Sequence, residues 1–168
     1  MLIDEDIPEG ITSGYEDPVD QLFVPILRQA KTYDVAVGYF TSGWLRDTAE
    51  GFAEFALSGG ESRWVVSPSL NKNDAEIIIE PRINPDQIID YRERKLFETI
   101  KGLKEDARKE LCSLIGAGVI KFRIAEPKKE GNTGMLHAKV GISTDASGNS
   151  VAFSGSYNLT SNAKFNWE

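Results

Sequence analysis

The chain has 168 residues, of which 40% are hydrophobic and 27% charged, which is typical of one folded domain and excludes a disordered chain or a coiled-coil rod. A single cysteine excludes an internal disulfide framework. One cysteine and one histidine are also too few for a Cys/His zinc site, although carboxylate metal sites stay open. Residues 1–20 hold seven acids and no Lys or Arg, so they carry the whole net charge of −7.

The negative net charge argues against nucleic-acid binding by overall electrostatic attraction. Residues 21–168 have no net charge, so a local basic site among them stays open. The opening residues lack the basic and apolar regions of a signal peptide, and no stretch approaches the length of a membrane span. The low cysteine count suits a reducing compartment. We therefore expect a cytoplasmic protein without a membrane partner.

Residues 1–16 are acidic and interrupted by proline and glycine, which predicts an extended arm ahead of a domain at 17–168. Asp17 and Pro18 form a typical helix start, because aspartate caps a helix and proline suits its first turn. Apolar residues then recur at helical spacing. Pro25 lies inside this pattern and is expected to kink or divide the helix.

The next segments predict a strand–helix–strand unit. Residues 35–40 and 63–67 are short apolar runs rich in β-formers, and 44–57 has helical periodicity between them. This order favours a right-handed βαβ unit with parallel strands. Residues 69–85 are loop-like, with a short strand possible at Ile77–Ile79.

The second half begins with a long amphipathic pattern at 86–115, which predicts one helix. Strands are predicted at 119–124, 136–142 and 151–154, with a hairpin turn at 145–149. The fold class expected from this order is α/β, with a mixed, largely parallel sheet and helices on both faces.

The candidate chemistry lies around the last two predicted strands. On a strand, His137 and Lys139 point to the same face. If the strands pair across the hairpin turn, Ser156 and Asn158 come close to them. A nucleophilic or basic imidazole beside a cation and neutral hydrogen-bonding groups suits an anionic substrate, such as a phosphodiester. Gly155 lacks a Cβ atom, so a bulky anion can approach its backbone.

These residues resemble the signature of the phospholipase D superfamily, H-x-K followed by G-S-x-N. In this chain the two motifs are His137-Ala138-Lys139 and Gly155-Ser156-Tyr157-Asn158. Single-copy bacterial nucleases of the superfamily add a glutamate, which matches Glu168. Residues 34–42, DVAVGYFTS, are similar to phospholipase D-like modules that precede helicase-like domains in bacterial DNA-processing and defence proteins. The resemblance spans roughly residues 15–168 and implies the superfamily's domain architecture.

The resemblance implies phosphodiester hydrolysis without a metal or other cofactor. His137 would form a phosphohistidine, and His137 of a second copy would protonate the leaving oxygen and later activate water. Lys139 and Asn158 would bind the phosphoryl oxygens, and Glu168 would orient a histidine ring. One motif copy in the chain implies a homodimer with the site across its twofold axis.

Further substrate contacts are expected from Gly155 and Ser156. Lys128 and Lys129 lie in a polar loop and are candidate contacts to a DNA backbone. Many relatives carry an aspartate at the position of Thr144, and here the aspartate is one residue later. The chain ends at the motif glutamate, which predicts a fragment of a longer protein with helicase-like or other domains.

The sequence therefore favours a nuclease module that acts on nucleic acid, with DNA expected, within a DNA-processing or restriction/defence protein. One alternative is a nucleic-acid-binding or dimerisation module that cleaves nothing by itself. Another is a lipid phosphodiesterase, although the chain carries neither a second motif copy nor a membrane-facing apolar segment.

Overall fold

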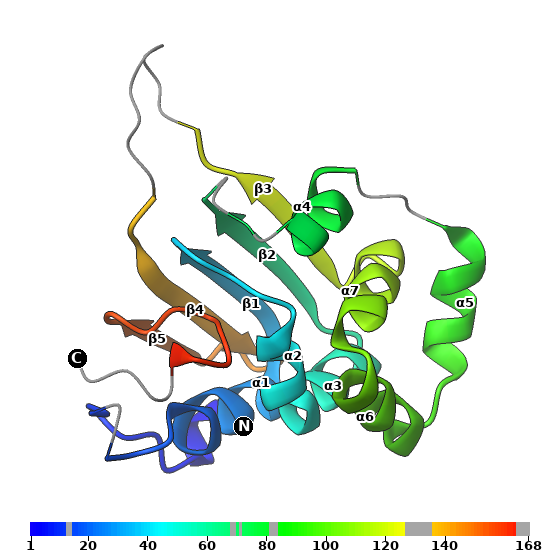
Figure 1. Ribbon diagram of the computed structural model, residues 1–168. Coiled ribbons are helices and arrows are strands. Elements are labelled where there is room, and N and C mark those ends of the chain that lie inside the picture. The colour runs from blue at the N-terminus through cyan, green and yellow to red at the C-terminus, as the bar shows by residue number, and fades with distance from the viewer. Residues whose placement is uncertain (13–14, 68–69, 71, 81–83, 127–135, 164–168) are drawn as a thin grey trace.

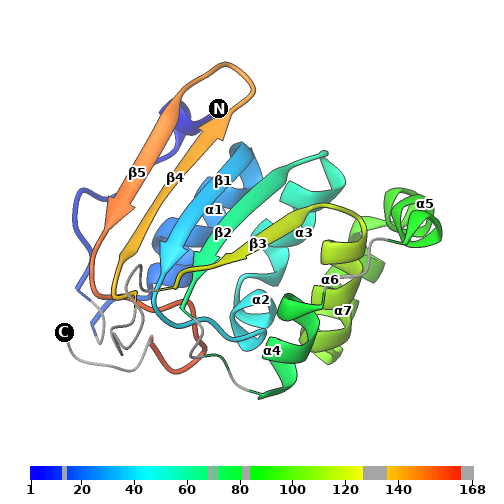
Figure 2. The ribbon, with the colours of Figure 1, turned by 90° about the horizontal axis from the view of Figure 1, so that it is seen from above.

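The computed structural model describes residues 1–12, 15–67, 70, 72–80, 84–126 and 136–163. They form an α/β fold with one five-stranded sheet in the order β3-β2-β1-β4-β5 (Figure 1, Figure 2). The strands are β1 (Ala30–Val37), β2 (Glu61–Val66), β3 (Ile120–Ile124), β4 (Lys139–Asp145) and β5 (Ser150–Ser154). The pairs β1–β2 and β2–β3 are parallel, whereas β1–β4 and β4–β5 are antiparallel. The sheet is thus evenly mixed and not largely parallel as predicted.

Seven α-helices belong to the described part of the chain. They are α1 (Val24–Gln29), α2 (Gly43–Asp47), α3 (Ala49–Leu57), α4 (Lys72–Ile79), α5 (Pro85–Glu93), α6 (Leu96–Glu105) and α7 (Ala107–Gly116). The helices α2 and α3 connect β1 to β2, and α4 to α7 connect β2 to β3. The connection from β1 to β2 is the predicted βαβ unit with parallel strands, and the connection from β2 to β3 also returns the chain to a parallel strand.

The predicted start and division of the first helix are confirmed. The backbone N–H of Val19 donates to the Asp17 carboxylate at 2.9 Å, so the aspartate caps the helix start. A π-helical segment spans Val19–Phe23, and α1 follows with Pro25 in its first turn. The chain therefore changes its helical form immediately before the proline, where one backbone donor is missing.

Several boundaries differ from the prediction. The single helix expected at 86–115 is three helices, and the last break lies at Asp106, whose carboxylate accepts a hydrogen bond from the Lys109 N–H at 3.1 Å and caps α7. The helix expected at 44–57 is divided at Thr48. Ile77–Ile79 belongs to α4 and not to a strand. A polar residue that satisfies helix-end groups ends a helix without interrupting the apolar pattern.

The described helices all lie on one face of the sheet, so the helical layer expected on the second face is absent from the described residues (Figure 2). Tyr33 and Val35 point into the core beneath the helices. On the opposite face Val140 and Ile142 are 41% and 52% exposed. Strand β1 begins at Ala30, earlier than predicted, and its first residues do not form an apolar run, because neither Lys31 nor Thr32 is buried where the pairing with β4 is irregular.

An aromatic cluster fills the core beneath the ends of β1 and β2. The rings of Trp44 and Trp64 are 5.4 Å apart, and Phe40 lies 4.9 Å from Trp64 in edge-to-face contact. All three side chains are fully buried. Both tryptophans are therefore core residues.

Asp145 joins the hairpin turn to the N-terminus. Its carboxylate accepts hydrogen bonds from the Asn149 side chain at 3.0 Å and from the backbone N–H groups of Ser147, Asn149 and Leu2, each at 2.9 Å. The Asn149 side chain, together with these backbone donors, lowers the pKa of the Asp145 carboxyl from its usual value of 3.8 to about 2. Asp145 lies at the far end of β4 from Lys139, so its contacts are structural.

We predict that Asp145→Ala lowers the free energy of unfolding at neutral pH. Because the folded-state pKa is depressed, the contribution of the carboxylate is complete above the unfolded-state pKa near 4. It is lost as the pH falls through about 2, where the folded protein also binds the proton. Urea unfolding across this range should show the difference between wild type and variant closing with falling pH.

The matched control is Asp20→Ala, which removes an exposed aspartate near α1. It should follow the wild type at every pH. A difference between wild type and Asp145→Ala that persists unchanged at pH 2 would contradict the assigned role of the charge.

Candidate active site

The residues of the predicted site gather at the carboxyl ends of β1 and β2. At this edge β4 starts beside the end of β1, with Lys139 opposite Val37. Strand β1 has parallel β2 on one side and antiparallel β4 on the other, so the direction of the strands reverses between β1 and β4. Ligands in open α/β sheets bind outside the carboxyl ends of the strands, where the strand order changes direction.

Lys139 and His137 contact each other directly. The Nζ atom of Lys139 lies 3.2 Å from Nε2 of His137 and 3.4 Å from the His137 carbonyl oxygen. His137 precedes β4 by two residues, so the prediction that both residues lie on the strand is wrong, although their side chains do meet. An ammonium group can only donate, so this contact requires a lone pair on Nε2.

The burial of Lys139 is unusual for a lysine. Its residue exposure is 6%, whereas His137 is exposed. Among the described residues, no carboxylate lies within ion-pair distance of the Lys139 ammonium. A buried cation without an acidic partner is costly to fold and provides a ready site for an anion.

Gly155 and Ser156 lie beside the lysine, as predicted. The Gly155 N–H donates to the carbonyl oxygen of Lys139 at 3.1 Å, which holds the end of β5 against the start of β4. A Cβ atom added at Gly155 would meet nothing within 4 Å. The backbone there faces open space, and both residues are exposed.

Asn158 reaches the same edge by another route. The next residue, Leu159, forms an isolated parallel bridge with Phe40, and its carbonyl oxygen accepts from the Thr41 N–H at 3.1 Å. The Oδ1 atom of Asn158 is buried and has no hydrogen-bond partner in the described part of the chain. The structure thus brings Asn158 to the carboxyl edge of β1, but the observed contacts of Lys139 do not include it.

Three predicted site residues are not placed. Glu168, Lys128 and Lys129 lie outside the described residues. The described site therefore consists of His137, Lys139 and the segment that follows β5.

Gly38 is a positioning residue that the sequence analysis missed. Its N–H donates to the carbonyl oxygen of Ala138 at 2.9 Å, and a Cβ atom there would overlap the carbonyl oxygen of Leu136. The same Cβ atom would lie 3.4 Å from Cα of His137. Only glycine allows the end of β1 to pack this closely on the backbone that carries the histidine. A glycine at the end of a predicted strand was the available signal.

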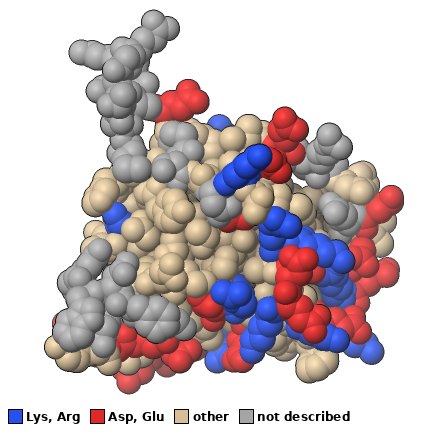
Figure 3. Space-filling view, in the orientation of Figure 1, with Lys and Arg blue, Asp and Glu red and all other residues tan. Residues whose placement is uncertain are grey.

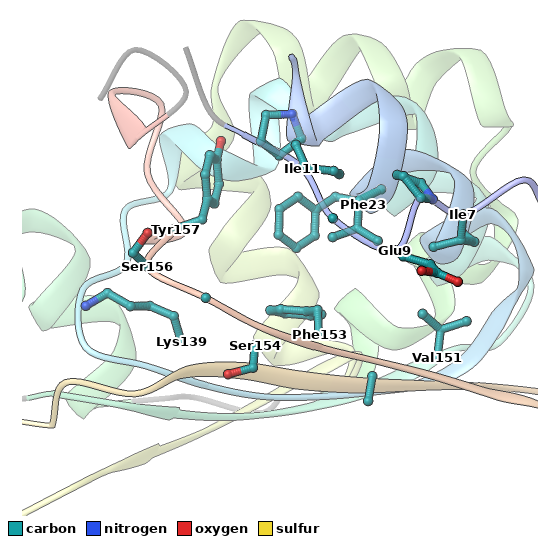
Figure 4. A pocket seen from close by; sticks show the side chains of 16 residues that line it. Ile7, Glu9, Ile11, Phe23, Lys139, Val151, Phe153, Ser154, Ser156 and Tyr157 are labelled. Carbon is teal, nitrogen blue, oxygen red and sulfur yellow. The ribbon is translucent and has the colours of Figure 1, made fainter. Parts of the chain in front are cut away.

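A pocket of about 260 Å³ opens beside the lysine (Figure 4). One wall is the end of β5 with the residues that follow it, and the other is the N-terminal arm around residues 7–11. Lys139 and Ser156 lie at one end, and Glu9 lies at the other. The arm was predicted only as an extended leader, and polarity gave no sign that it would line a pocket.

Aromatic rings line the middle of the pocket. Phe23 and Phe153 are in edge-to-face contact at 5.3 Å, and Tyr157 lies 5.5 Å from Phe23. Burial, together with the nearby charges of Asp17 and Asp47, raises the pKa of the Tyr157 phenol. The tyrosine is therefore neutral and serves as a ring with a polar tip.

Charge is distributed unevenly over the molecule. Figure 3 shows acidic side chains along the lower left edge, where Figure 1 places the N-terminal segment, and mixed charges over α5, α6 and α7. Among the described residues, no group of three or more His, Cys, Asp and Glu side chains could hold a metal ion. Within the same residues, no helix has the length and apolarity to cross a membrane.

Comparison of the sequence with models of protein families finds no match, and a search of curated proteins finds none either.

We predict that Gly38→Ala destabilises the protein by about 1–3 kcal/mol, because the added methyl group must displace the segment before β4. Urea unfolding measures this loss. Gly10→Ala is the control, since a Cβ atom there meets nothing within 4 Å. Equal stability of the Gly38→Ala and Gly10→Ala variants would show that the packing of Gly38 on His137 is not constraining.

Proposed function

We propose that this chain is a metal-independent phosphodiesterase module of phospholipase D type, which acts on nucleic acid as a homodimer. The observation that carries the proposal is the ammonium group of the buried Lys139, which lies 3.2 Å from Nε2 of His137 and has no carboxylate partner among the residues that the structure describes. A nucleophilic nitrogen beside an uncompensated cation suits attack on a phosphodiester, whose negative charge the cation would stabilise.

The chemistry of the proposal has two steps. In the first, Nε2 of His137 attacks phosphorus, the bond to the leaving oxygen breaks, and that oxygen takes a proton from His137 of the second copy. In the second, water attacks phosphorus and gives a proton to the same imidazole of the second copy. The bond between phosphorus and His137 then breaks, which restores the enzyme.

The other side chains act on the charge of the phosphoryl group. When a phosphodiester enters, the Lys139 ammonium stops donating to Nε2 of His137 and donates to a phosphoryl oxygen instead. The lone pair on Nε2 is then available for attack. Ser156 and the Asn158 amide supply neutral donors, and the unobstructed backbone at Gly155 leaves room for the phosphate. Glu168, Lys128 and Lys129 keep their proposed roles in ring orientation and backbone binding.

DNA is the proposed polymer, and a helicase-like or other domain is the proposed neighbour in the parent chain. Both rest on the likeness of residues 34–42 to modules of DNA-processing and defence proteins. The site requires a homodimer in this proposal because each chain supplies a single histidine.

The decisive experiment traps the intermediate. We expect the wild type to cleave DNA in excess EDTA and to accumulate, after a rapid alkaline detergent quench with ³²P-labelled substrate, a phosphoryl adduct that is stable in base and is lost in acid. Such an adduct is a phosphoramidate, and its loss in His137→Ala assigns it to the single histidine of the sequence. Sedimentation of the same sample measures whether the active species is a dimer.

His137→Ala should lose both the cleavage and the adduct. Cleavage that EDTA abolishes would contradict the proposal, because it would require a metal. Binding of DNA without cleavage, unchanged in His137→Ala, would instead favour the non-cleaving binding module.

We further predict opposite effects of Lys139→Met on stability and activity. Because Lys139 is buried and no described carboxylate pairs with it, its removal should leave the free energy of unfolding unchanged or higher. The rate of cleavage should fall by about 10²- to 10³-fold, as for loss of one group that stabilises charge in a transition state. Urea unfolding and initial rates measure the two effects.

Lys121→Met is the matched control, since Lys121 is an exposed lysine on β3 that pairs with Glu61. It should leave the rate unchanged. A parallel loss of stability and rate in Lys139→Met would show that the lysine is only structural.

A further inference from the structure

We infer that the pocket beside Lys139 binds the terminal nucleoside of a single-stranded nucleic acid, so that the site releases nucleotides from a strand end. This inference rests on the proposed function, because Lys139 belongs both to the proposed phosphate site and to the pocket lining. A phosphodiester held by Lys139 and Ser156 therefore has one substituent next to the pocket.

The size of the pocket favours one nucleoside. A volume of about 260 Å³ is slightly below that of pockets for drug-sized ligands. It suits one base with its sugar and is too small for a stacked base pair. A base can enter only after it leaves the helical stack, which is least costly in a single strand or a frayed end.

The lining of the pocket favours a base over an acyl chain. Phe153 and Tyr157 are partly exposed aromatic side chains on the wall formed by β5 and the segment after it (Figure 4). Every base has a face that can stack on such rings. The two ends of the pocket also differ in charge, with the Lys139 cation at one end and the Glu9 carboxylate at the other. This polarity matches a nucleotide, with its phosphate at Lys139 and the N–H donors of its base toward Glu9.

The charge of the arm favours a strand end over an internal position. The arm around residues 7–11 forms the wall that carries Glu9, and the sequence segment 1–20 to which it belongs contains no Lys or Arg but also holds Asp6 and Asp20. A strand that continued past the pocket would carry its next phosphates toward these acids, without a basic group to bind them. The terminal nucleoside has no further phosphate on that side and avoids the repulsion.

The first test compares a linear single-stranded oligonucleotide with the same sequence closed into a circle. We expect the wild type to shorten the linear strand from one end, one nucleotide at a time, and to cut the circle at least about tenfold more slowly. Cleavage of both at equal rates, or cuts distributed along the linear strand, would overturn the inference. Release of headgroups from phosphatidylcholine vesicles in place of nucleotides would also overturn it.

The second test fills the pocket. Val151 lines it from β5, and Val151→Phe places a larger side chain there (Figure 4). The KM for the linear oligonucleotide should rise about tenfold, the cost of one lost stacking contact. The kcat/KM for methyl p-nitrophenyl phosphate, a diester without a nucleoside, should stay within about twofold. Val65→Phe on the opposite face of the sheet is the matched control and should change neither value.

A binding measurement separates this inference from the proposed function. The wild type should bind 3′-dAMP or 5′-dAMP about tenfold more tightly than methyl phosphate, and Val151→Phe should remove the preference. Preserved selectivity in a protein that cleaves no diester would refute the proposed hydrolysis and keep the pocket assignment. Cleavage of methyl p-nitrophenyl phosphate without any preference for the nucleotides would refute the pocket alone.

Discussion

The antiparallel pairing of β4 with β1 sets the positions of His137 and Lys139 and, through β5, that of Gly155. Because β1 runs toward the edge at which β4 begins, Lys139 lies opposite Val37, and His137 lies just outside the sheet. Strand β5 runs antiparallel to β4 and ends at the same edge, which brings Gly155 onto the Lys139 carbonyl. A register shift of one residue would turn Lys139 to the open face, where it would be an ordinary solvated lysine.

The pairing of β4 with β1 holds polar groups of the site in buried positions that lower the stability of the fold. Within the part of the chain that the structure describes, the buried Lys139 has no carboxylate partner and the buried Oδ1 atom of Asn158 has no hydrogen-bond donor, and both cost free energy. The aromatic cluster of Trp44, Trp64 and Phe40 lies beneath the same edge and contributes large buried apolar area there. Unfavourable groups concentrated above a well-packed support are typical of functional sites, where local cost is retained because binding requires it.

Much of this arrangement could be predicted from sequence, and what could not be predicted depends on contacts between distant segments. The βαβ order, the division at Pro25 and the proximity of His137 to Lys139 follow from local periodicity and spacing. The apolar pattern at 86–115 continues through the break at Asp106, but the three helices do not bury one continuous stripe, because Ile89 and Leu96 are exposed whereas Leu103 and Leu111 are buried. The role of Gly38 depends on the strand that pairs beside it, which no local pattern specifies.

The arm shows most clearly how distant contacts shape the site. Its composition indicates an unstructured leader, yet it is held at two points, by the Leu2 N–H on Asp145 and by the Gln29 side chain on Glu5 at 2.8 Å. The first contact lies at the opposite end of β4 from Lys139. One wall of the pocket is therefore fixed through a hairpin turn that touches no site residue. Leu2 is also buried in the hydrophobic core and Ile7 packs against it, so apolar burial and these hydrogen bonds together set the position of the arm. The shape of the pocket therefore depends on the arm and the turn as well as on the motif residues.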